Sequence, residues 1–211
     1  MRRRNGQKKR IYSVVKRGAD IVISAGGLIA LSPAFLVTMG AIKKEDPSAP
    51  VIFTQTRIGK DGKAFRFYKF RSMVPGAEEQ LEELRELNEK KDGPMFKITD
   101  DPRITKVGRF IRKYSIDELP QLINVLRGEM SVVGPRPSLP REVRKFTEHQ
   151  KKRLSVTPGL TCYWQTRSDR NTMSFDEWVE LDLKYIRNMS ITTDLAIILR
   201  TIATVARGEG I

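Results

Sequence analysis

The chain has 211 residues, a formal net charge of +14 and a pI of about 10.1. That length suits one domain of ordinary size with an added segment. The single cysteine, Cys162, and the single histidine, His149, exclude an internal disulfide framework, a Cys/His zinc site and a Ser-His-Asp triad. Any chemistry must therefore rest on carboxylates, lysines, arginines and a hard metal ion.

The first 17 residues form a basic juxtamembrane arm with eight basic side chains and no acidic one. An anionic cytoplasmic leaflet attracts such an arm by about 1 kcal/mol per cation near the surface. Nucleic acid is the rival partner for a basic segment. The membrane is favoured, and no nucleic acid is expected as a partner, because an apolar stretch follows the arm directly.

That apolar stretch covers residues 21–42, which carry no charge and contain Ser32 and Pro33 at their middle. About 20 apolar residues can span a bilayer as one helix, but basic flanks prefer the cytoplasm, and both flanks here are basic. A proline inside a helix removes a hydrogen bond and bends the axis. We therefore expect residues 18–45 to form a re-entrant membrane helix hairpin broken at Ser32-Pro33. A kinked spanning helix and a buried soluble helix are the alternatives.

A β-hairpin is predicted next: residues 51–57 alternate and are rich in β-formers, residues 59–62 supply turn chemistry, and residues 64–70 return as the second strand. Residues 157–171 have no clear period and indicate an ordered loop. The expected helices cover residues 78–91, 104–111, 116–126, 141–153, 175–188 and 193–206.

These elements predict a mostly helical α+β fold with a short β-hairpin. Residues 46–211 are expected to form a cytoplasmic catalytic domain with membrane-surface helices. The last apolar helix, residues 193–206, suits either interior packing or a position on the membrane surface.

Asp117 and Glu118, the acid pair, lie near the start of the helix predicted at 116–126. Proline is tolerated only in a first helical turn, so Pro120 indicates that the pair occupies the helix N-terminus. The partial positive charge there lowers a carboxyl pKa. Such an aspartate serves as a helix cap, as an Mg²⁺ ligand or as a nucleophile toward phosphorus, and the spacing does not choose among them.

The cationic candidates lie on turn-rich segments near the acid pair, and arginine's planar fork suits phosphate. A solvated surface charge is the alternative at each position. Taken together with the acid pair and the apolar segment, they indicate phosphoryl transfer at a membrane surface. These candidates are Lys69, Arg71, Arg103, Arg109, Arg112, Arg136, Arg167 and Arg170.

A series of short motifs resembles the monotopic phosphoglycosyl transferases, bacterial sugar transferases that start glycan assembly on undecaprenyl phosphate. The similarity runs from about residue 16 to the end of the sequence, in the minimal catalytic form without extra N-terminal spanning helices. In chain order the motifs are KRGAD at 16–20, SP at 32–33, KFRSM at 69–73, SIDELPQL at 115–122, GPRP at 134–137, PGLT at 158–161 and WQ at 164–165.

The resemblance implies a ping-pong reaction in which Asp117 attacks the sugar-bearing phosphate of a UDP-sugar and expels UMP. Undecaprenyl phosphate then captures the covalent intermediate and forms undecaprenyl diphosphate-sugar. Glu118 is implied as a base or phosphate-positioning acid, and Mg²⁺ as a cofactor held largely at Asp117. Lys69, Arg112, Arg136 and Arg170 match positively charged positions of the family's motifs.

The resemblance also implies a place on the cytoplasmic face of the bacterial inner membrane, in contact with its lipid. The reaction would be the first membrane step of exopolysaccharide, capsule, O-antigen or glycoprotein glycan assembly. The sequence does not name the sugar, and it leaves open whether the protein is a homo-oligomer.

One segment departs from the family pattern: residues 164–171, the late loop, are one residue longer than usual and lack a glycine. Either Arg167 or Arg170 can therefore occupy the position of the family arginine. A non-enzymatic membrane-surface or nucleic-acid-binding protein is the alternative function. It accounts for the charge and the apolar segment, but not for the acid pair or the order of the motifs.

Overall fold

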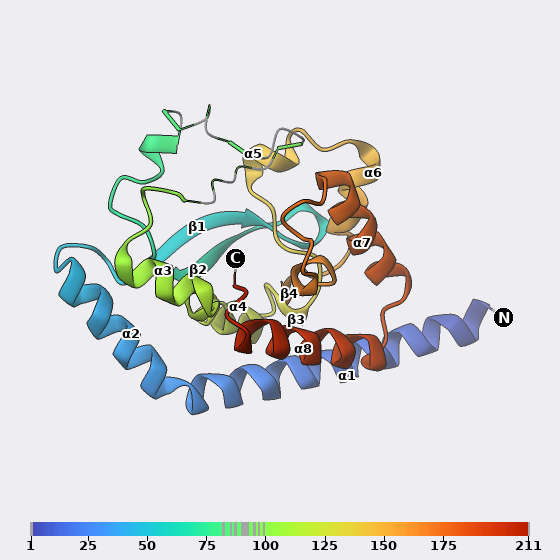
Figure 1. Cartoon of the computed structure of the whole chain (residues 1–211). Coiled ribbons are helices and arrows are strands. Elements are labelled where there is room, and N and C mark those ends of the chain that lie inside the picture. Colours follow the sequence, from blue (N-terminus) through green and yellow to red (C-terminus); the bar gives the residue numbers. More distant parts are fainter. Residues whose placement is uncertain are drawn as a thin grey trace.

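The computed structural model describes residues 2–210, apart from residues 82, 85, 87, 90–92, 95, 97 and 99, and describes side chains from residue 10 onward. Helices dominate, with one antiparallel and one parallel pair of short strands. The predicted mostly helical α+β fold with a β-hairpin is therefore confirmed. A long N-terminal helix, α1, runs along one side of the molecule, and α2 continues from it at an angle (Figure 1).

Helix α1 spans Arg2–Ala30 and α2 spans Ser32–Glu45. Their axes are bent by 59°, and Pro33 lies in the first turn of α2, where its missing N–H costs least. The break falls where the sequence predicted it, but the basic arm and the first apolar half form one continuous helix. No single described helix is long and apolar enough to cross a bilayer, whereas the bent pair from Arg10 to Glu45 satisfies that test as a unit.

Polar side chains attach α1 to the rest of the protein. The buried Asp20 carboxylate accepts hydrogen bonds from Ser131 Oγ at 3.0 Å and Val132 N at 2.9 Å. Arg17 donates to the carbonyls of Val125 and Leu126 at 2.6 and 2.7 Å. These carbonyls belong to the C-terminal turn of α4, Gln121–Arg127, where the helix dipole favours a cation. The KRGAD motif thus joins α1 to the body.

The antiparallel hairpin pairs β1, Ile52–Ile58, with β2, Ala64–Phe70, in a register from Ile52↔Phe70 to Ile58↔Ala64. The turn between them, Lys60–Gly62, needs a positive φ at Gly62, as its turn residues predicted. The hairpin prediction is therefore confirmed to within one residue at each end.

A second, parallel strand pair was not predicted. It joins β3, Ser131–Val133, to β4, Gly159–Thr161. The two chains approach so closely that a Cβ on Gly159 would lie 2.0 Å from the Gly134 nitrogen. Strands of three residues give no periodic signal, and their pairing depends on contacts far apart in sequence.

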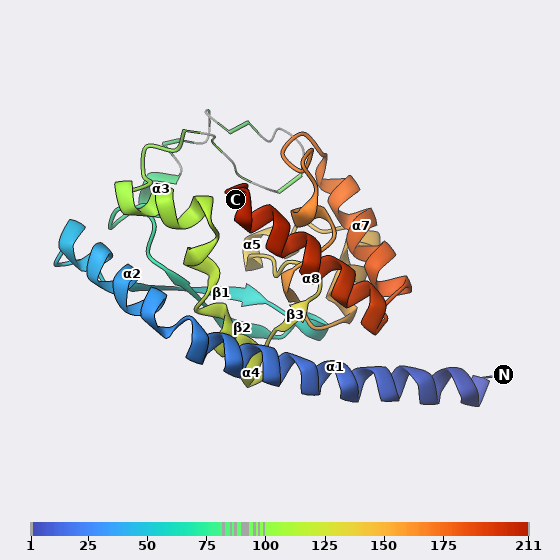
Figure 2. The ribbon, with the colours of Figure 1, turned by 60° about the horizontal axis from the view of Figure 1, so that its bottom comes forward.

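The remaining α-helices surround the strands, and α8 and α1 lie on the same side of the hairpin, as the two views show (Figures 1 and 2). These helices are α3 (Lys106–Lys113), α5 (Pro140–Val143), α6 (Glu148–Lys151), α7 (Phe175–Arg187) and α8 (Ile191–Ala206).

Two predicted helices differ from the structure. The helix expected at 141–153 is divided, because Thr147 and Gln150 form a capping box that starts α6 anew. Within residues 78–91, the described part contains a short 3₁₀ turn, Glu79–Leu81, and further turns. Residues 82, 85, 87, 90 and 91 of that prediction lie outside the described residues. Leu81 and Leu84 are only partly buried, so tertiary packing gives a helix little support there.

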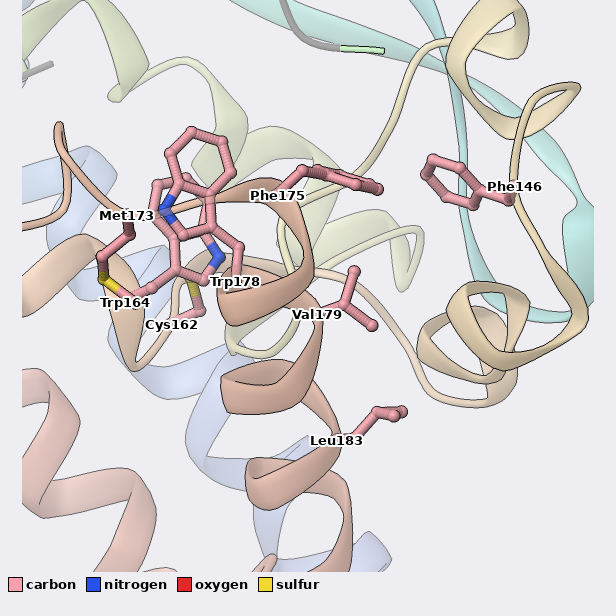
Figure 3. Close-up of a cluster of buried hydrophobic side chains, with 8 residues drawn as sticks. All are labelled: Phe146, Cys162, Trp164, Met173, Phe175, Trp178, Val179 and Leu183. Atoms are coloured by element: carbon pink, nitrogen blue, oxygen red, sulfur yellow. The ribbon is translucent and has the colours of Figure 1, made fainter. Parts of the chain in front are cut away.

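Three clusters of apolar side chains form the core. The largest joins α7 to the segment after β4, and in it the indole rings of Trp164 and Trp178 stack with centroids 4.3 Å apart (Figure 3). A second lies beneath the hairpin around Phe67 and Tyr185, and a third packs Ile42 of α2 against Phe70. The late loop is thereby fixed to α7, and α2 is fixed to the hairpin.

Candidate active site

A tight turn presents the acid pair. Ser115 adopts a left-handed conformation with φ of 52°, and Asp117 and Glu118 follow in the 3₁₀ turn Ile116–Glu118. Both carboxyl groups are buried, with 4 and 7% of each residue exposed. The prediction that they begin a helix is wrong in detail, because α4 starts only at Gln121 and Pro120 is its N-cap residue.

Two cations hold the acid pair from different parts of the chain. Lys69 of β2 places Nζ 2.8 Å from Glu118 Oε1 and 3.3 Å from Asp117 Oδ2. Arg136 places Nη1 3.1 Å from Glu118 Oε1, and its own carbonyl accepts a hydrogen bond from Arg153. The KFRSM, SIDELPQL and GPRP motifs therefore meet at one place.

The two carboxyl groups experience this environment differently. Burial opposes ionisation of Glu118, but Lys69 and Arg136 outweigh it and lower the pKa of Glu118 to about 2. Burial raises the pKa of Asp117 above its ordinary value, and Lys69 only partly opposes this. The lowered pKa expected for Asp117 from a helix N-terminus is thus not observed, because that helix begins further along and the carboxyl group is buried.

A cavity of about 750 Å³ opens beside Asp117. Of the candidate cations, it is lined by Lys69, Arg71, Arg103, Arg109, Arg112, Arg136 and Arg170, but not by Arg167. Arg103 is engaged by Asp101, with Nη2 2.6 Å from Oδ2. Arg71 donates from Nε to the Pro50 carbonyl at 2.8 Å. The cavity is therefore strongly cationic, with several arginines already bound to other groups.

The sequence missed Arg57 of β1 as a site residue. Arg57 lines the cavity, places Cζ 5.2 Å from the centre of the Phe67 ring and donates to the Pro137 carbonyl at 3.2 Å. Its buried Nε has no hydrogen-bond partner within the described part of the chain. Burial and the nearby Arg136 lower the pKa of Arg57 to about 10.

The strand period could have identified Arg57. Side chains two residues apart share one face of a strand, so Phe53, Gln55 and Arg57 lie on the same face of β1. In the antiparallel register Phe53 pairs with Lys69, and Phe53, Gln55, Arg57 and Lys69 all line the cavity. Once Lys69 is taken as a site residue, the hairpin places Arg57 on the same wall.

The two arginines of the late loop differ in position. Arg167 is half exposed and paired with Asp169, with Nη2 2.6 Å from Oδ2. Arg170 is buried and lines the cavity. Its Nη1 donates to the Gln165 carbonyl at 2.9 Å, and its Nη2 donates to the carbonyls of Glu209 and Gly210. Of these two arginines, only Arg170 therefore lines the cavity, and it is bound to backbone.

Among the described residues, no group of three or more His, Cys, Asp or Glu side chains lies close enough together to hold a metal ion. Mg²⁺ often binds through only one or two carboxylates, and substrate phosphates and water complete its shell. Asp117 lines the cavity, whereas the Glu118 carboxylate forms ion pairs with Lys69 and Arg136. The donor set therefore fits Mg²⁺ through Asp117 together with the phosphates of a ligand.

The site is suited to phosphate groups, because a buried carboxyl pair held by cations opens on an arginine-lined cavity. The body that carries this site is joined to a bent pair of apolar helices. A sequence model of the family described as "Bacterial sugar transferase" matches residues 11–208. The chain belongs to this family, which confirms the resemblance drawn from the motifs.

Individual relatives are similar along almost the whole chain. The galactosyl transferase CpsE of Streptococcus agalactiae is 46% identical over 199 residues, which are 94% of this chain and 44% of that protein. The undecaprenyl-phosphate galactose phosphotransferase of Salmonella typhimurium is 41% identical over 216 residues, covering 100% of this chain and 44% of that protein. The exopolysaccharide production protein ExoY of Rhizobium meliloti is 38% identical over 97% of this chain and 91% of its own length. The chain thus spans less than half of the first two relatives.

Proposed function

We propose that this chain transfers a sugar phosphate from a UDP-sugar to undecaprenyl phosphate at a membrane, as the first membrane step of exopolysaccharide, capsule or related glycan assembly. The observation that carries the proposal is the buried Asp117 at a cavity lined by Lys69, Arg112 and Arg136. Relatives named undecaprenyl-phosphate galactose phosphotransferase and UDP-galactose-lipid carrier transferase support both substrates.

The reaction needs a nucleophile, and Asp117 is the carboxylate that faces the cavity. A carboxylate oxygen of Asp117 attacks the sugar-bearing phosphorus, and the bond from that phosphorus to the UMP oxygen breaks. An oxygen of undecaprenyl phosphate then attacks the same phosphorus and releases the Asp117 carboxylate. Two displacements at one phosphorus make the reaction ping-pong.

Lys69, Arg112, Arg136 and Arg57 supply positive charge around the phosphates. Such preorganised cations stabilise the charge that develops on the phosphoryl oxygens in the transition state. Glu118, held ionised by Lys69 and Arg136, fixes the positions of these two cations. When bound at Asp117, Mg²⁺ would neutralise phosphate charge and lower the pKa of this carboxyl group.

Arg57 is best accounted for by a bound phosphate. The Arg57 side chain is partly buried, and a cation withdrawn from water is costly unless it is paired. No described carboxylate lies within ion-pair distance of its guanidinium. Burial lowers the pKa of Arg57, and repulsion by the neighbouring Arg136 lowers it further. A phosphate group of the ligand would pair with the Arg57 guanidinium and relieve the repulsion between the two arginines.

The membrane position is proposed from exposed apolar side chains. Helix α8 exposes Ile191, Leu195, Leu199 and Ile202, whose spacing of four, four and three residues places them on one helix face. On the bent pair, Val22, Ile29, Leu36 and Val37 are 69–76% exposed. We propose that α8 lies on the cytoplasmic membrane surface and that α1 and α2 enter the same leaflet as a re-entrant pair.

The reaction is tested by measuring UMP release from a panel of UDP-sugars in detergent with Mg²⁺, with and without undecaprenyl phosphate. UDP-galactose and UDP-N-acetylgalactosamine head the panel, because relatives carry those sugars in their names. Acceptor-dependent UMP release with one donor supports the proposal. Salt-sensitive nucleic-acid binding without any turnover would instead favour a binding protein.

The membrane position is tested separately with vesicles of anionic lipid. Leu199→Glu should weaken vesicle binding about tenfold, because it places a charge on the apolar face. Ala196→Glu adds the same charge at another exposed position of α8 and is the matched control. Equal binding of both variants would contradict the surface position of α8.

A further inference from the structure

Residues 207–210, here named the strap, follow α8 and run against the end of α3. The Gly210 nitrogen donates to the Lys113 carbonyl at 2.8 Å. Gly210, Lys113 and Arg112 all line the cavity that contains Asp117. The strap therefore lies between the end of α8 and the segment that leads into the acid pair.

Two glycines allow this close approach. A Cβ on Gly210 would lie 1.9 Å from the Arg112 carbonyl oxygen and 2.5 Å from that of Lys113, and both obstacles are backbone atoms. Gly208 has a φ of 67°, and a Cβ there would lie 2.8 Å from the flexible end of the Lys113 side chain. A side chain at Gly210 must consequently displace either the strap or the end of α3.

Arg170 holds the strap from the other side. Its two terminal nitrogens donate to three backbone carbonyls, one in the late loop at Gln165 and two in the strap at Glu209 and Gly210. Only Nε remains without a partner among the described residues. The planar fork of arginine thus joins the late loop to the strap and directs three of its five N–H donors to backbone carbonyls.

The atom that Gly210 approaches is part of the turn before the nucleophile. The Arg112 carbonyl accepts the Ser115 N–H at 3.0 Å, and the Ser115 carbonyl accepts the Glu118 N–H at 3.2 Å. Ser115 is one of two described non-glycine residues with positive φ. Such a conformation persists only where surrounding contacts impose it.

We propose that the strap, held by Arg170, fixes the turn at 112–118 and thereby positions Asp117, so that Arg170 is a positioning residue and not a phosphate ligand. The inference rests on the proposed function only in giving Asp117 the role of nucleophile. A displacement of about 1 Å at a reacting group can lower a rate about 100-fold. Small changes in the strap should therefore affect the chemical step.

The first experiment compares Gly210→Ala and Gly208→Ala with the control Gly62→Ala. Gly62 also has a positive φ, of 78°, but has open space around it in the β1–β2 turn. Stopped-flow UMP release without acceptor measures formation of the covalent intermediate. We expect Gly210→Ala to slow this step at least about tenfold with the donor KM within about threefold. Gly208→Ala should give a smaller loss, and the control should match wild type.

The second experiment replaces Arg170 with Gln and with Lys, and uses Arg187→Gln as the control. Arg187 is an exposed arginine at the end of α7. We expect Arg170→Gln to lower kcat at nearly constant KM, and Arg170→Lys to restore part of the rate by donating to one or two of the carbonyls. A raised KM with unchanged kcat would show instead that Arg170 binds the donor, which would overturn the proposal.

Hydrogen exchange tests the coupling without any turnover. The amides of Ser115 and Glu118 should exchange faster in Gly210→Ala and Arg170→Gln than in wild type, while those of β1 and β2 remain unchanged. Gly208→Ala and Arg170→Lys replace these variants if either one unfolds. Unchanged exchange at 115–118 would overturn the inference. Absence of UMP release from wild type would overturn the proposed function alone.

Discussion

Arg136 and Arg170 line the same cavity, yet the structure gives them different partners. Arg136 is bound to the Glu118 carboxylate, whereas Arg170 is bound to three backbone carbonyls. Arg136 gives only Nη1 to Glu118, so other donors of its guanidinium remain for an arriving phosphate, and Lys69 adds a second positive charge beside that one carboxylate. An arginine among carbonyls fixes the positions of chain segments. Position in a cavity therefore does not by itself assign a cation to ligand binding.

The largest effect is expected at Asp117, the carboxylate next to Arg136 in the cavity. Asp117→Asn should reduce UMP release to less than about one-thousandth of wild type, because an amide is a poor nucleophile and a poor metal ligand. Asp61→Asn, at an exposed aspartate of the hairpin turn, is the control. Wild-type rates in Asp117→Asn would show that Asp117 is not the nucleophile. The comparison of Arg136 and Arg170 would then lose the reacting group on which it depends.

Arg136→Gln should lower kcat about 100-fold, since it removes a preorganised cation from the transition state. Unlike Arg170→Gln, it also removes one of the two cations that keep Glu118 ionised. The pH–rate profile of Arg136→Gln should therefore shift at its acidic side, and that of Arg170→Gln should not. Identical shifts in both variants would show that the two arginines act alike.

Arg57→Gln should raise the donor KM about tenfold, as expected for the loss of one charged hydrogen bond. The thermal midpoint of unfolding should stay constant or rise, because the substitution removes a partly buried cation that has no described carboxylate partner. Steady-state kinetics and calorimetry on the same preparation measure the two quantities. A lower midpoint with an unchanged KM would make Arg57 a structural residue like Arg170.

Glu118→Gln should change how stability depends on pH. The pKa of Glu118 is lower in the folded protein than the value of about 4.3 in an unfolded chain. Its ionisation therefore stabilises the fold above that value, and this contribution is lost as pH falls toward 2. Urea midpoints at several pH values should decline less steeply below pH ~4.5 in Glu118→Gln than in wild type. Equal slopes would mean that Lys69 and Arg136 do not favour the ionised form.

Local signals predicted much of the fold. The glycines of the turn at 59–62 and the alternation around it predicted the hairpin, and the Ser32-Pro33 pair predicted the break between α1 and α2. Each of these depends on the backbone preferences of a few neighbouring residues. The β3–β4 pair depends on contacts between distant segments, and three-residue strands carry no detectable period.

The site was also predicted only in part, because local motifs can be identified in a sequence and contacts between distant segments cannot. Motif order identified Asp117, Glu118, Lys69 and Arg136, and the structure brings these four together. The strap carbonyls that Arg170 binds were not predictable, because they lie about forty residues away in the sequence. Arg57 needed the register of the hairpin, which assigns a face to each side chain.

The attachment of α1 to the body has a consequence for exchanging parts between family members. Arg17 binds carbonyls of α4, Asp20 binds the start of β3, and Lys16 pairs with Asp194 of α8 at 2.9 Å. A chimera that takes its N-terminal helices from one relative and the remainder from another would combine the two sides of these contacts from different parents. Hybrids are expected to fold only when residues 12–24 come from the same parent as α4, β3 and α8, so this helix is inherited together with the body of the protein.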